Sequence, residues 1–391
     1  MERLSDQAVQ EFVALRRDIH QHPELAFDEH RTSALVAQKL AQWGYAVTPG
    51  LGGTGVVGQL RRGDAKRTIG LRADMDALPI VEATGADWSS HHHGVMHACG
   101  HDGHTAMLLA AAHHLATQGN FDGTLNLIFQ PAEEGGGGAL KMMEDGLFER
   151  FPCDAIFAMH NMPGFAQGQL VFRSGPTMAS SDYATVTLHG QGGHGAMPHK
   201  ATDVVVAAAS LILALQTVVS RHVDPMQPAV VTVGAVQAGQ ANNVIPASAR
   251  LELSVRALDP QVRSSVEQRI RELVRLQAES FGVRAELDWR PGYAVLVNDA
   301  QQTARALAVA QAHFPPQQVV AQGPMLTGSE DFAFMLERVP GSYLFIGNGT
   351  GQEPGACMVH NPAYDFNDHN IATGAAYWIA LVNELLSPTH P

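Results

Sequence analysis

Cysteine and positive charge are both scarce in this chain of 391 residues. The three cysteines, Cys99, Cys153 and Cys357, are too few and odd in number to indicate a disulfide framework, so we expect a reducing, cytoplasmic environment. The 25 basic residues are outnumbered by 38 acidic ones, which gives a formal net charge of -13. Because surfaces that bind nucleic acid need an excess of basic residues, this balance argues against a nucleic acid as partner.

Long hydrophobic runs are scarce as well. The longest, residues 204–219, is interrupted by Ser210 and Gln216 and falls short of a full membrane span. We interpret it as a buried helix with Thr202 or Asp203 as its N-cap. The N-terminus carries acidic residues early and lacks the apolar core of a signal peptide, so neither a membrane location nor secretion is expected.

The length and the hydrophobic pattern predict an α/β protein of two domains. Helical spacing over residues 5–43 is broken at His22-Pro23-Glu24. Residues 56–60 and 68–73 read as two strands of a hairpin around the turn at 61–64, and strands then alternate with helices. We expect residues 1–182 and 293–391 to form a catalytic domain in which helices flank a mixed sheet.

Residues 183–292 follow a different pattern. They read as strand, helix, strand, strand, helix and strand, which predicts an inserted α+β, ferredoxin-like domain with its helices on one face of an antiparallel sheet.

The densest group of potential metal ligands is Met-His-Ala-Cys-Gly-His-Asp-Gly-His at 96–104. Cys99 and His101 can both reach one ion, because Gly100 lets the backbone turn tightly between them. A buried cysteine is more often inert packing, and only the neighbouring ligand types favour a metal here. Catalytic zinc sites use about three protein ligands, so the histidines cannot all be ligands, and we expect residues 91–93 to form a solvated loop without a role.

Two adjacent carboxylates follow about thirty residues later in Gln-Pro-Ala-Glu-Glu at 130–134. Most acidic pairs are simply solvated, but the apolar strand that precedes Glu133 and Glu134 argues against this. One carboxylate can then bind a metal while the other takes a proton from water whose pKa the metal has lowered to roughly 7.

Two His-Asn segments add further ligands, at His160-Asn161 and at His360-Asn361. A lone histidine is more often structural, yet together with Cys99, His101 and the glutamates they suffice for two ions. Asp74 and Asp76 lie at the end of another strand. They either orient a ligand histidine by a hydrogen bond, without binding the metal themselves, or serve as ordinary N-cap or turn residues.

In residues 183–292, His194 lies among glycines, so its imidazole can project into a neighbouring site. Asn243, before a proline, and Arg256, in a strand, supply donors that suit an oxyanion or a substrate carboxylate. Their structural alternatives are a turn asparagine and a surface cation. The glycine pattern at 53–58 has the spacing of a dinucleotide loop, but a strand rather than a helix follows it, so nucleotide binding is not expected.

These motifs together resemble a known family. In chain order they are Arg-Ala-Asp-Met-Asp-Ala-Leu-Pro at 72–79, the segments 96–104 and 130–138, His160-Asn161, the segment 192–198, Gly-Ser-Glu-Asp-Phe at 328–332, and His360-Asn361-Pro362. The chain resembles the metal-dependent amidohydrolases of the hippurate hydrolase, N-acyl-amino-acid amidohydrolase and auxin-conjugate hydrolase type, within the aminoacylase and carboxypeptidase superfamily. The resemblance runs from about His20 to Asp368.

The resemblance implies hydrolysis of the amide bond of small N-acyl amino acids at a centre of two divalent ions per subunit, zinc or manganese first and cobalt or nickel next. The ligands it implies are Cys99, His101, Glu134, His160 and His360. It makes Glu133 the general acid/base and His194 the residue that stabilises the oxyanion, reaching into the site of a partner subunit in a homodimer formed through the inserted domain. Asn243, Arg256 and a backbone contact at Gly328 would bind the substrate.

Two rival functions remain open. A dipeptidase or aminopeptidase would bind a free amine where the acyl group sits, and a catalytically silent relative would bind metal without turnover. The presence of Glu133 with all five candidate ligands argues against the silent relative.

Overall fold

The computed structural model describes residues 4–388, so the N-terminal residues Met1 to Arg3, part of the segment expected not to be a signal peptide, lie outside it. The chain divides into two compact units. Unit 1 comprises residues 1–175, 298–324 and 334–391. Unit 2 comprises residues 176–297 and 325–333.

Unit 1 is built on a mixed sheet of eight strands in the order β1-β2-β4-β3-β5-β16-β6-β15. Strands β4, β3, β5 and β16 run parallel to one another in its centre. The strands are β1 (Ala46–Leu51), β2 (Gly55–Arg62), β3 (Thr68–Asp74), β4 (Gly123–Gln130), β5 (Ala155–Pro163), β6 (Leu170–Val171), β15 (Val319–Val320) and β16 (Gly341–Gly349). The central strands are buried along almost their whole length, as parallel strands with helices on both faces must be.

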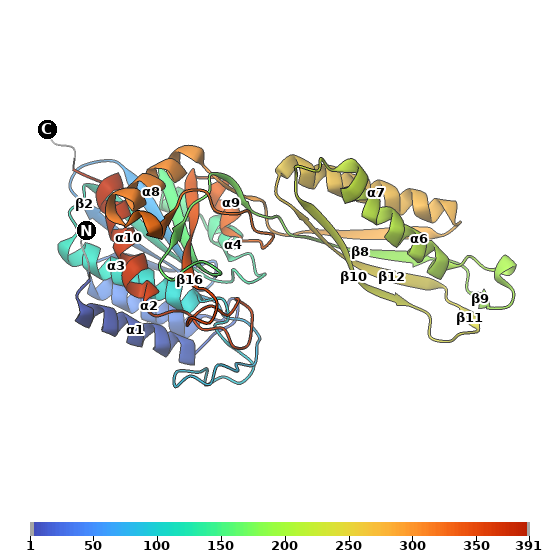
Figure 1. Cartoon of the computed structure of the whole chain (residues 1–391), viewed down its shortest axis with the longest axis horizontal. Coiled ribbons are helices and arrows are strands. Elements are labelled where there is room, and N and C mark those ends of the chain that lie inside the picture. The colour runs from blue at the N-terminus through green and yellow to red at the C-terminus, as the bar shows by residue number, and fades with distance from the viewer. Residues whose placement is uncertain (1–3, 389–391) are drawn as a thin grey trace. The chain divides into compact units, whose positions relative to one another are not determined.

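Helices cover this sheet (Figure 1). They are α1 (Asp6–Gln21), α2 (His30–Gln42), α3 (His101–Gln118), α4 (Gly138–Glu144), α5 (Leu147–Arg150), α8 (Ala300–His313) and α10 (Asn370–Leu385), while α9 (Phe332–Leu336) spans the boundary between the units. Helix α3 is rich in Ala and Leu and is buried on nearly every side, with α1, α10 and the sheet as neighbours. The expected break between two N-terminal helices at His22-Pro23-Glu24 is confirmed.

The expected hairpin between residues 56–60 and 68–73 is wrong. Strand β2 pairs with β1 and β4, both antiparallel, and β3 pairs with β4 and β5, both parallel. Strand β4 therefore lies between the two segments, which are adjacent in sequence but not in the sheet.

Unit 2 contains a four-stranded antiparallel sheet in the order β10-β12-β8-β13. Its elements follow as β8 (Asp182–His189), α6 (Val204–Thr217), β10 (Ala229–Ala238), β12 (Ser248–Ala257), α7 (Pro260–Ser280) and β13 (Arg284–Pro291), with both helices on one face (Figure 1). This is the predicted strand and helix order. A small ladder, β9 (Gly193–His194) with β11 (Val244–Ile245), lies apart from this sheet.

Helix α6 differs from the buried helix that the sequence suggested. Asp203 caps it, accepting from the N–H groups of Val205 and Val206, as one of the two predicted caps. Only one face is buried, and Leu213 on the other face is 72% exposed. Together with the π-helix η2 (Val218–His222), it forms a stretch of 19 residues that is long and apolar enough to cross a membrane, contrary to the expectation from sequence. Its buried face packs on α7 and the sheet of unit 2, so this single helix is weak evidence for a membrane span.

Candidate metal centre

Cys99 and His101 lie at the start of α3, where the chain turns sharply. Gly100 between them has φ +83, and a Cβ there would overlap the hydroxyl of Tyr364 and the side-chain amide of Asn161. Only glycine combines this backbone conformation with the available space. Both side chains are buried, and their ligand atoms lie within 4.8 Å of each other.

Glu133 and Glu134 follow β4, as the sequence predicted. Glu133 is buried, and Glu134 is partly exposed. The backbone N–H of Glu134 donates to Oδ2 of Asp76 at 2.8 Å, so the end of β3 holds the loop that follows β4.

The two His-Asn segments bring their histidines to the same place. His160, near the end of β5, places Nε2 3.4 Å from Sγ of Cys99, while its Nδ1 contacts the backbone oxygen of Asn161. His360 has φ 65, and its backbone N–H donates to the carbonyl oxygen of Ala98. Its Nε2 lies 3.1 Å from Oε1 of Glu134.

These side chains form overlapping groups whose ligand atoms lie within 4.8 Å of one another. One group is Cys99, His101 and His160; a second is Cys99, Glu134 and His360; a third joins His101 with Glu133 and Glu134. Nε2 of His101 is buried and has no hydrogen-bond partner among the residues that the structure describes. An unpartnered imidazole nitrogen beside a thiol and a carboxylate fits a divalent metal, since Cys, His and Glu are all zinc ligands.

The electrostatics of the group also favour a cation. Burial, followed by the nearby Glu134 and Glu133, raises the pKa of the Cys99 thiol. Burial alone would lower the pKa of His101, but Asp74, Asp76 and Glu134 raise it to about 10. The surplus of negative charge therefore attracts either protons or a metal ion, and a bound metal would favour the thiolate that it needs as a ligand.

Asp76 and Asp74 both lie near His101 but have different hydrogen-bond partners; Oδ2 of Asp74 is 3.8 Å from Nε2 of His101. Oδ1 of Asp76 lies 3.1 Å from Nδ1 of His101, which leaves Nε2 of that histidine for an ion. Asp74 instead contacts Nδ1 of His104 at 2.6 Å and accepts from Arg72 at 2.7 Å.

His104 and Asn161 belong to the site although the sequence analysis gave neither a role. Nε2 of His104 accepts the backbone N–H of Asn161 at 2.9 Å, so this nitrogen carries no proton. The proton is on Nδ1, which donates to Asp74. The Asn161 side chain donates to the carbonyl oxygen of Cys99 at 2.6 Å and accepts from the Tyr364 hydroxyl at 2.7 Å. The repeated His-Asn pair was the available signal for Asn161, whereas nothing local distinguished His104 from the other histidines.

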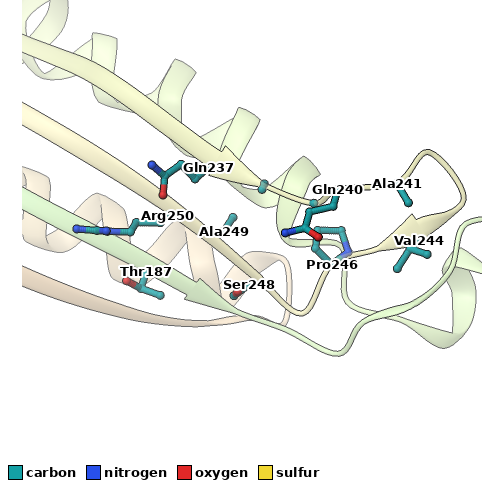
Figure 2. Close-up of a pocket in the computed structure, with 11 residues that line it drawn as sticks. Thr187, Gln237, Gln240, Ala241, Val244, Pro246, Ser248, Ala249 and Arg250 are labelled. Carbon is teal, nitrogen blue, oxygen red and sulfur yellow. The ribbon is translucent and has the colours of Figure 1, made fainter.

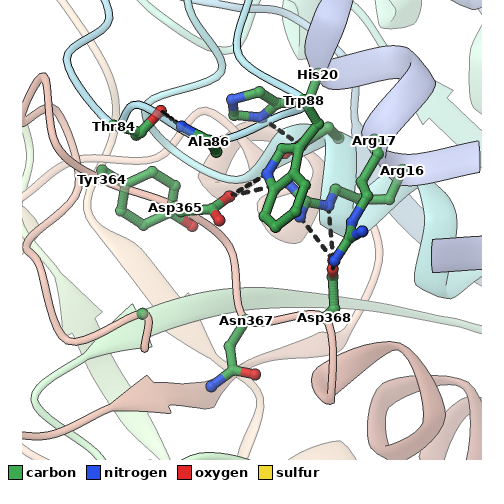
Figure 3. A network of polar contacts seen from close by, with 12 residues as sticks. Arg16, Arg17, His20, Thr84, Ala86, Trp88, Tyr364, Asp365, Asn367 and Asp368 are labelled. Carbon is green, nitrogen blue, oxygen red and sulfur yellow. Dashed lines mark hydrogen bonds and ion pairs between the residues drawn. The ribbon is translucent and has the colours of Figure 1, made fainter. Parts of the chain in front are cut away.

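An ionic network around Arg16, which Figure 3 shows with Asp365 and Asp368, also reaches Asp102 at the start of α3. Arg16 is fully buried and pairs with Asp365 at 2.9 Å, with Asp368 at 2.7 Å and with Asp102 at 3.3 Å. Asp102, next to the candidate ligand His101, also contacts Nδ1 of His20 at 2.8 Å. Removing one member of such a network leaves a buried charge without compensation.

The remaining predicted residues lie in unit 2. His194 is exposed on β9, which pairs with β11, and the carbonyl oxygen of Asn243 accepts the N–H of Gly195 at 2.8 Å. Arg256, on β12, donates to the Ser329 hydroxyl at 3.1 Å and to the Tyr183 hydroxyl at 3.3 Å. The structure thus brings His194 close to Asn243, and Arg256 close to the segment that contains Gly328.

Unit 2 also has a hollow of about 700 Å³ at the ends of β10 and β12 (Figure 2). Its lining includes Thr187, Gln237, Gln240, Val244 and Arg250 and none of the candidate metal ligands. It is not the metal centre.

Comparison with known proteins identifies the family. Residues 70–384 match the Peptidase family M20/M25/M40. The chain is 45% identical over 376 residues to a hippurate hydrolase of Campylobacter jejuni, covering 96% of this chain and 97% of that protein. It is 39% identical to an N-acetyl-L-cysteine deacetylase of Bacillus subtilis, covering 96% and 88%.

A solved structure agrees with this assignment. The YXEP protein of Bacillus subtilis, described as a dinuclear metal binding peptidase from the M20 family, superimposes with a TM-score of 0.85 at 31% identity and covers 98% of this chain and 100% of its own. The resemblance predicted from the sequence motifs is confirmed, and the chain belongs to the Peptidase family M20/M25/M40.

Proposed function

We propose that this protein is a metal-dependent amidohydrolase that splits the amide bond of small N-acyl amino acids into a carboxylic acid and a free amino acid. The proposal rests mainly on the position of Glu133, which is buried and whose carboxylate lies within 4.8 Å of ligand atoms of His101 and Glu134. Relatives named hippurate hydrolase, N-acetyl-L-cysteine deacetylase and N-acetyldiaminopimelate deacetylase support the substrate class.

The proposed centre binds two divalent ions per subunit. The ligands are Cys99, His101, Glu134, His160 and His360, and the mixture of thiolate, imidazole and carboxylate admits zinc or manganese first and cobalt or nickel next. When bound, the ions polarise the scissile carbonyl and lower the pKa of water.

Glu133 moves the proton. Its carboxylate accepts a proton from the attacking water and then returns that proton to the nitrogen of the leaving amino acid, so one water is consumed for each amide cleaved. Asp76 orients the ring of His101 and holds the N–H of Glu134, which fixes two ligands whose donor atoms lie within 4.8 Å of the Glu133 carboxylate.

Residues of unit 2 complete the proposed site. We assign His194 to the oxyanion of a partner subunit's site, in a homodimer formed through the inserted domain at residues 183–292. Arg256 would bind the substrate carboxylate, with Asn243 and the backbone of Gly328 as further contacts. The Ser329 and Tyr183 hydroxyls that Arg256 contacts hold its guanidinium in place.

We place the enzyme in the cytoplasm, in line with its three unpaired cysteines, of which Cys99 is needed as a free thiol. A peptidase acting on free dipeptides is the second candidate, supported by the M20 peptidase structure and by a thermostable carboxypeptidase of Saccharolobus solfataricus that is 36% identical. Replacing Glu133 by Gln separates chemistry from metal binding: turnover should fall while the metal content stays normal. Near-normal turnover in this variant would refute the assignment of Glu133.

A further inference from the structure

The loop that carries Glu133 has an unusual backbone conformation. Ala132 has φ 53, in the left-handed region that alanine rarely adopts. Its carbonyl oxygen accepts the N–H of Gly138 at 3.1 Å, and the carbonyl oxygen of Glu133 accepts the N–H of Gly135 at 2.7 Å. A Cβ at Gly138 would overlap the carbonyl oxygen of Pro131, so the four glycines after Glu134 let the loop close tightly over Ala132.

Glu29 reaches this loop from the N-cap of α2 and is fully buried. Its Oε1 accepts the backbone N–H of Ala132 at 2.9 Å and that of Phe27 at 3.0 Å. Its Oε2 accepts the hydroxyl of Thr54. All three partners are hydrogen-bond donors from the protein itself, so the Glu29 carboxyl group is committed to holding structure.

Glu133 therefore sits between two anchored neighbours. Glu29 holds the N–H of Ala132 before it, and Asp76 holds the N–H of Glu134 after it. The two anchors differ in what else they touch. Asp76 also contacts the candidate ligand His101, whereas the hydrogen-bond partners of Glu29 in the described part of the chain are Ala132, Phe27 and Thr54.

We propose that Glu29 is a positioning residue for Glu133: by fixing the left-handed Ala132, it sets the direction in which the Glu133 carboxylate points. This inference rests on the proposed function, in which Glu133 is the general acid/base. It predicts that loss of Glu29 slows the chemical step without releasing metal.

The choice of substitution separates the hydrogen bond from the charge. Glu29→Ala leaves the Ala132 N–H without its acceptor. Glu29→Gln keeps Oε1 as an acceptor, and its amide group can donate to the Thr54 hydroxyl, which can turn to accept. Burial raises the pKa of Glu29, while the hydrogen bonds from Thr54 and Ala132 oppose that shift, so the neutral glutamine is a fair substitute.

Glu24, in the segment before α2, provides a matched control because its carboxylate caps the start of the same helix. Its Oε1 accepts the N–H of Arg31 at 2.7 Å and its Oε2 that of Thr32 at 2.8 Å. Glu24→Ala therefore removes a carboxylate that accepts from the first turn of α2, and no hydrogen bond that the structure shows joins this carboxylate to residues 131–138. It reports the cost of weakening this helix end alone.

The first measurement is hydrogen–deuterium exchange of peptides covering residues 130–138, which needs no substrate. In Glu29→Ala we expect exchange to be roughly tenfold faster in these peptides, and close to wild type in Glu29→Gln and Glu24→Ala. Unchanged exchange in Glu29→Ala, or equal acceleration in Glu24→Ala, would overturn the proposal.

The second measurement is steady-state kinetics with metal analysis on the same proteins. Glu29→Ala should lose roughly 10- to 100-fold in kcat with full metal content and little change in KM, and Glu29→Gln should recover most of it. Loss of metal in Glu29→Ala, or an equal loss of kcat in Glu24→Ala, would contradict the positioning role. If Glu133→Gln keeps its turnover, the proposed function fails, whereas the exchange result still tests the contact between Glu29 and Ala132.

Discussion

Asp76 accepts the backbone N–H of Glu134 through Oδ2 at 2.8 Å, and its Oδ1 lies 3.1 Å from Nδ1 of His101. One carboxylate from the end of β3 thus fixes two candidate ligands that come from different parts of the chain. The tautomer of His101 depends on this contact, because a proton on Nδ1 leaves Nε2 free to bind an ion.

We therefore expect Asp76→Asn to weaken metal binding about 10- to 100-fold. If the asparagine oxygen keeps the N–H of Glu134, its NH2 group faces Nδ1 of His101 and favours the tautomer with the proton on Nε2, which cannot bind metal. Titration of the metal-free protein with zinc measures the effect. Exposed Asp87→Asn is the control and should bind as wild type does. Equal affinities in both variants would contradict the role of Asp76.

Two cysteines with different surroundings test the ligand assignment. Cys99→Ala should lose metal, because Cys99 belongs to two of the candidate ligand groups. Cys153→Ala should keep it, since the Cys153 thiol contacts Asn126 and the carbonyl oxygen of Phe151. Metal analysis of both purified variants decides the point, and full occupancy in Cys99→Ala would remove this residue from the centre.

The stability of the metal-free protein should fall as pH rises through the titration of His20. Burial alone would lower its pKa, but Asp102 and the hydrogen bond to Glu82 raise it to about 9, against the opposing effect of Arg16. The ring of His97 also lies near His20, with 6.1 Å between the two ring centroids. Because the folded-state pKa exceeds the ordinary value of 6.5, the stabilisation is complete below about pH 6.5 and is lost as pH rises past 9.

The shift corresponds to about 3 kcal/mol. Urea unfolding of the metal-free protein at pH 6 and pH 9.5 should show a loss of stability that is about 3 kcal/mol smaller in His20→Gln than in the wild type, because His101, whose pKa is raised to about 10, contributes to the loss in both. The exposed His92→Gln serves as the control and should behave as the wild type. If His20→Gln lost as much stability as the wild type over this range, His20 would not be the group responsible.

The proposed role of His194 in a partner subunit predicts complementation. Glu133→Gln and His194→Ala should each be nearly inactive. After the two are mixed and the subunits exchange, half of the dimers are mixed and each has one intact site, so activity should return to about a quarter of the wild-type value. A mixture that stays inactive after verified exchange would place His194 in its own subunit's site or outside the site.

The sequence predicted the grouping of the candidate metal ligands better than it predicted the pairing of the strands. Cys99, Gly100 and His101 are contiguous, so their grouping depends on one local turn that a glycine permits. The strand and helix order of residues 183–292 was also readable, because each element has its own hydrophobic period. The hairpin between β2 and β3 failed because local pattern does not specify strand partners, and β4 pairs with both from about sixty residues further on.

Contacts between segments that are far apart in the chain could also not be predicted from the sequence. Glu29 looks like any acid before a helix, and its bond to Ala132 spans 103 residues. His104 likewise carries no local mark that separates it from its neighbours, although it holds the backbone of Asn161.

We expect the candidate metal centre to hydrolyse N-acyl amino acids with the help of bound metal. The most direct test is to assay metal-free and metal-reconstituted enzyme on N-acetyl, N-benzoyl and indoleacetyl amino acids beside free dipeptides, measuring released amino acid. We predict release from acylated substrates that disappears with the metal and returns with zinc or manganese. Cleavage of dipeptides alone would make the protein a peptidase, and bound metal without turnover on either set would contradict the enzymatic assignment.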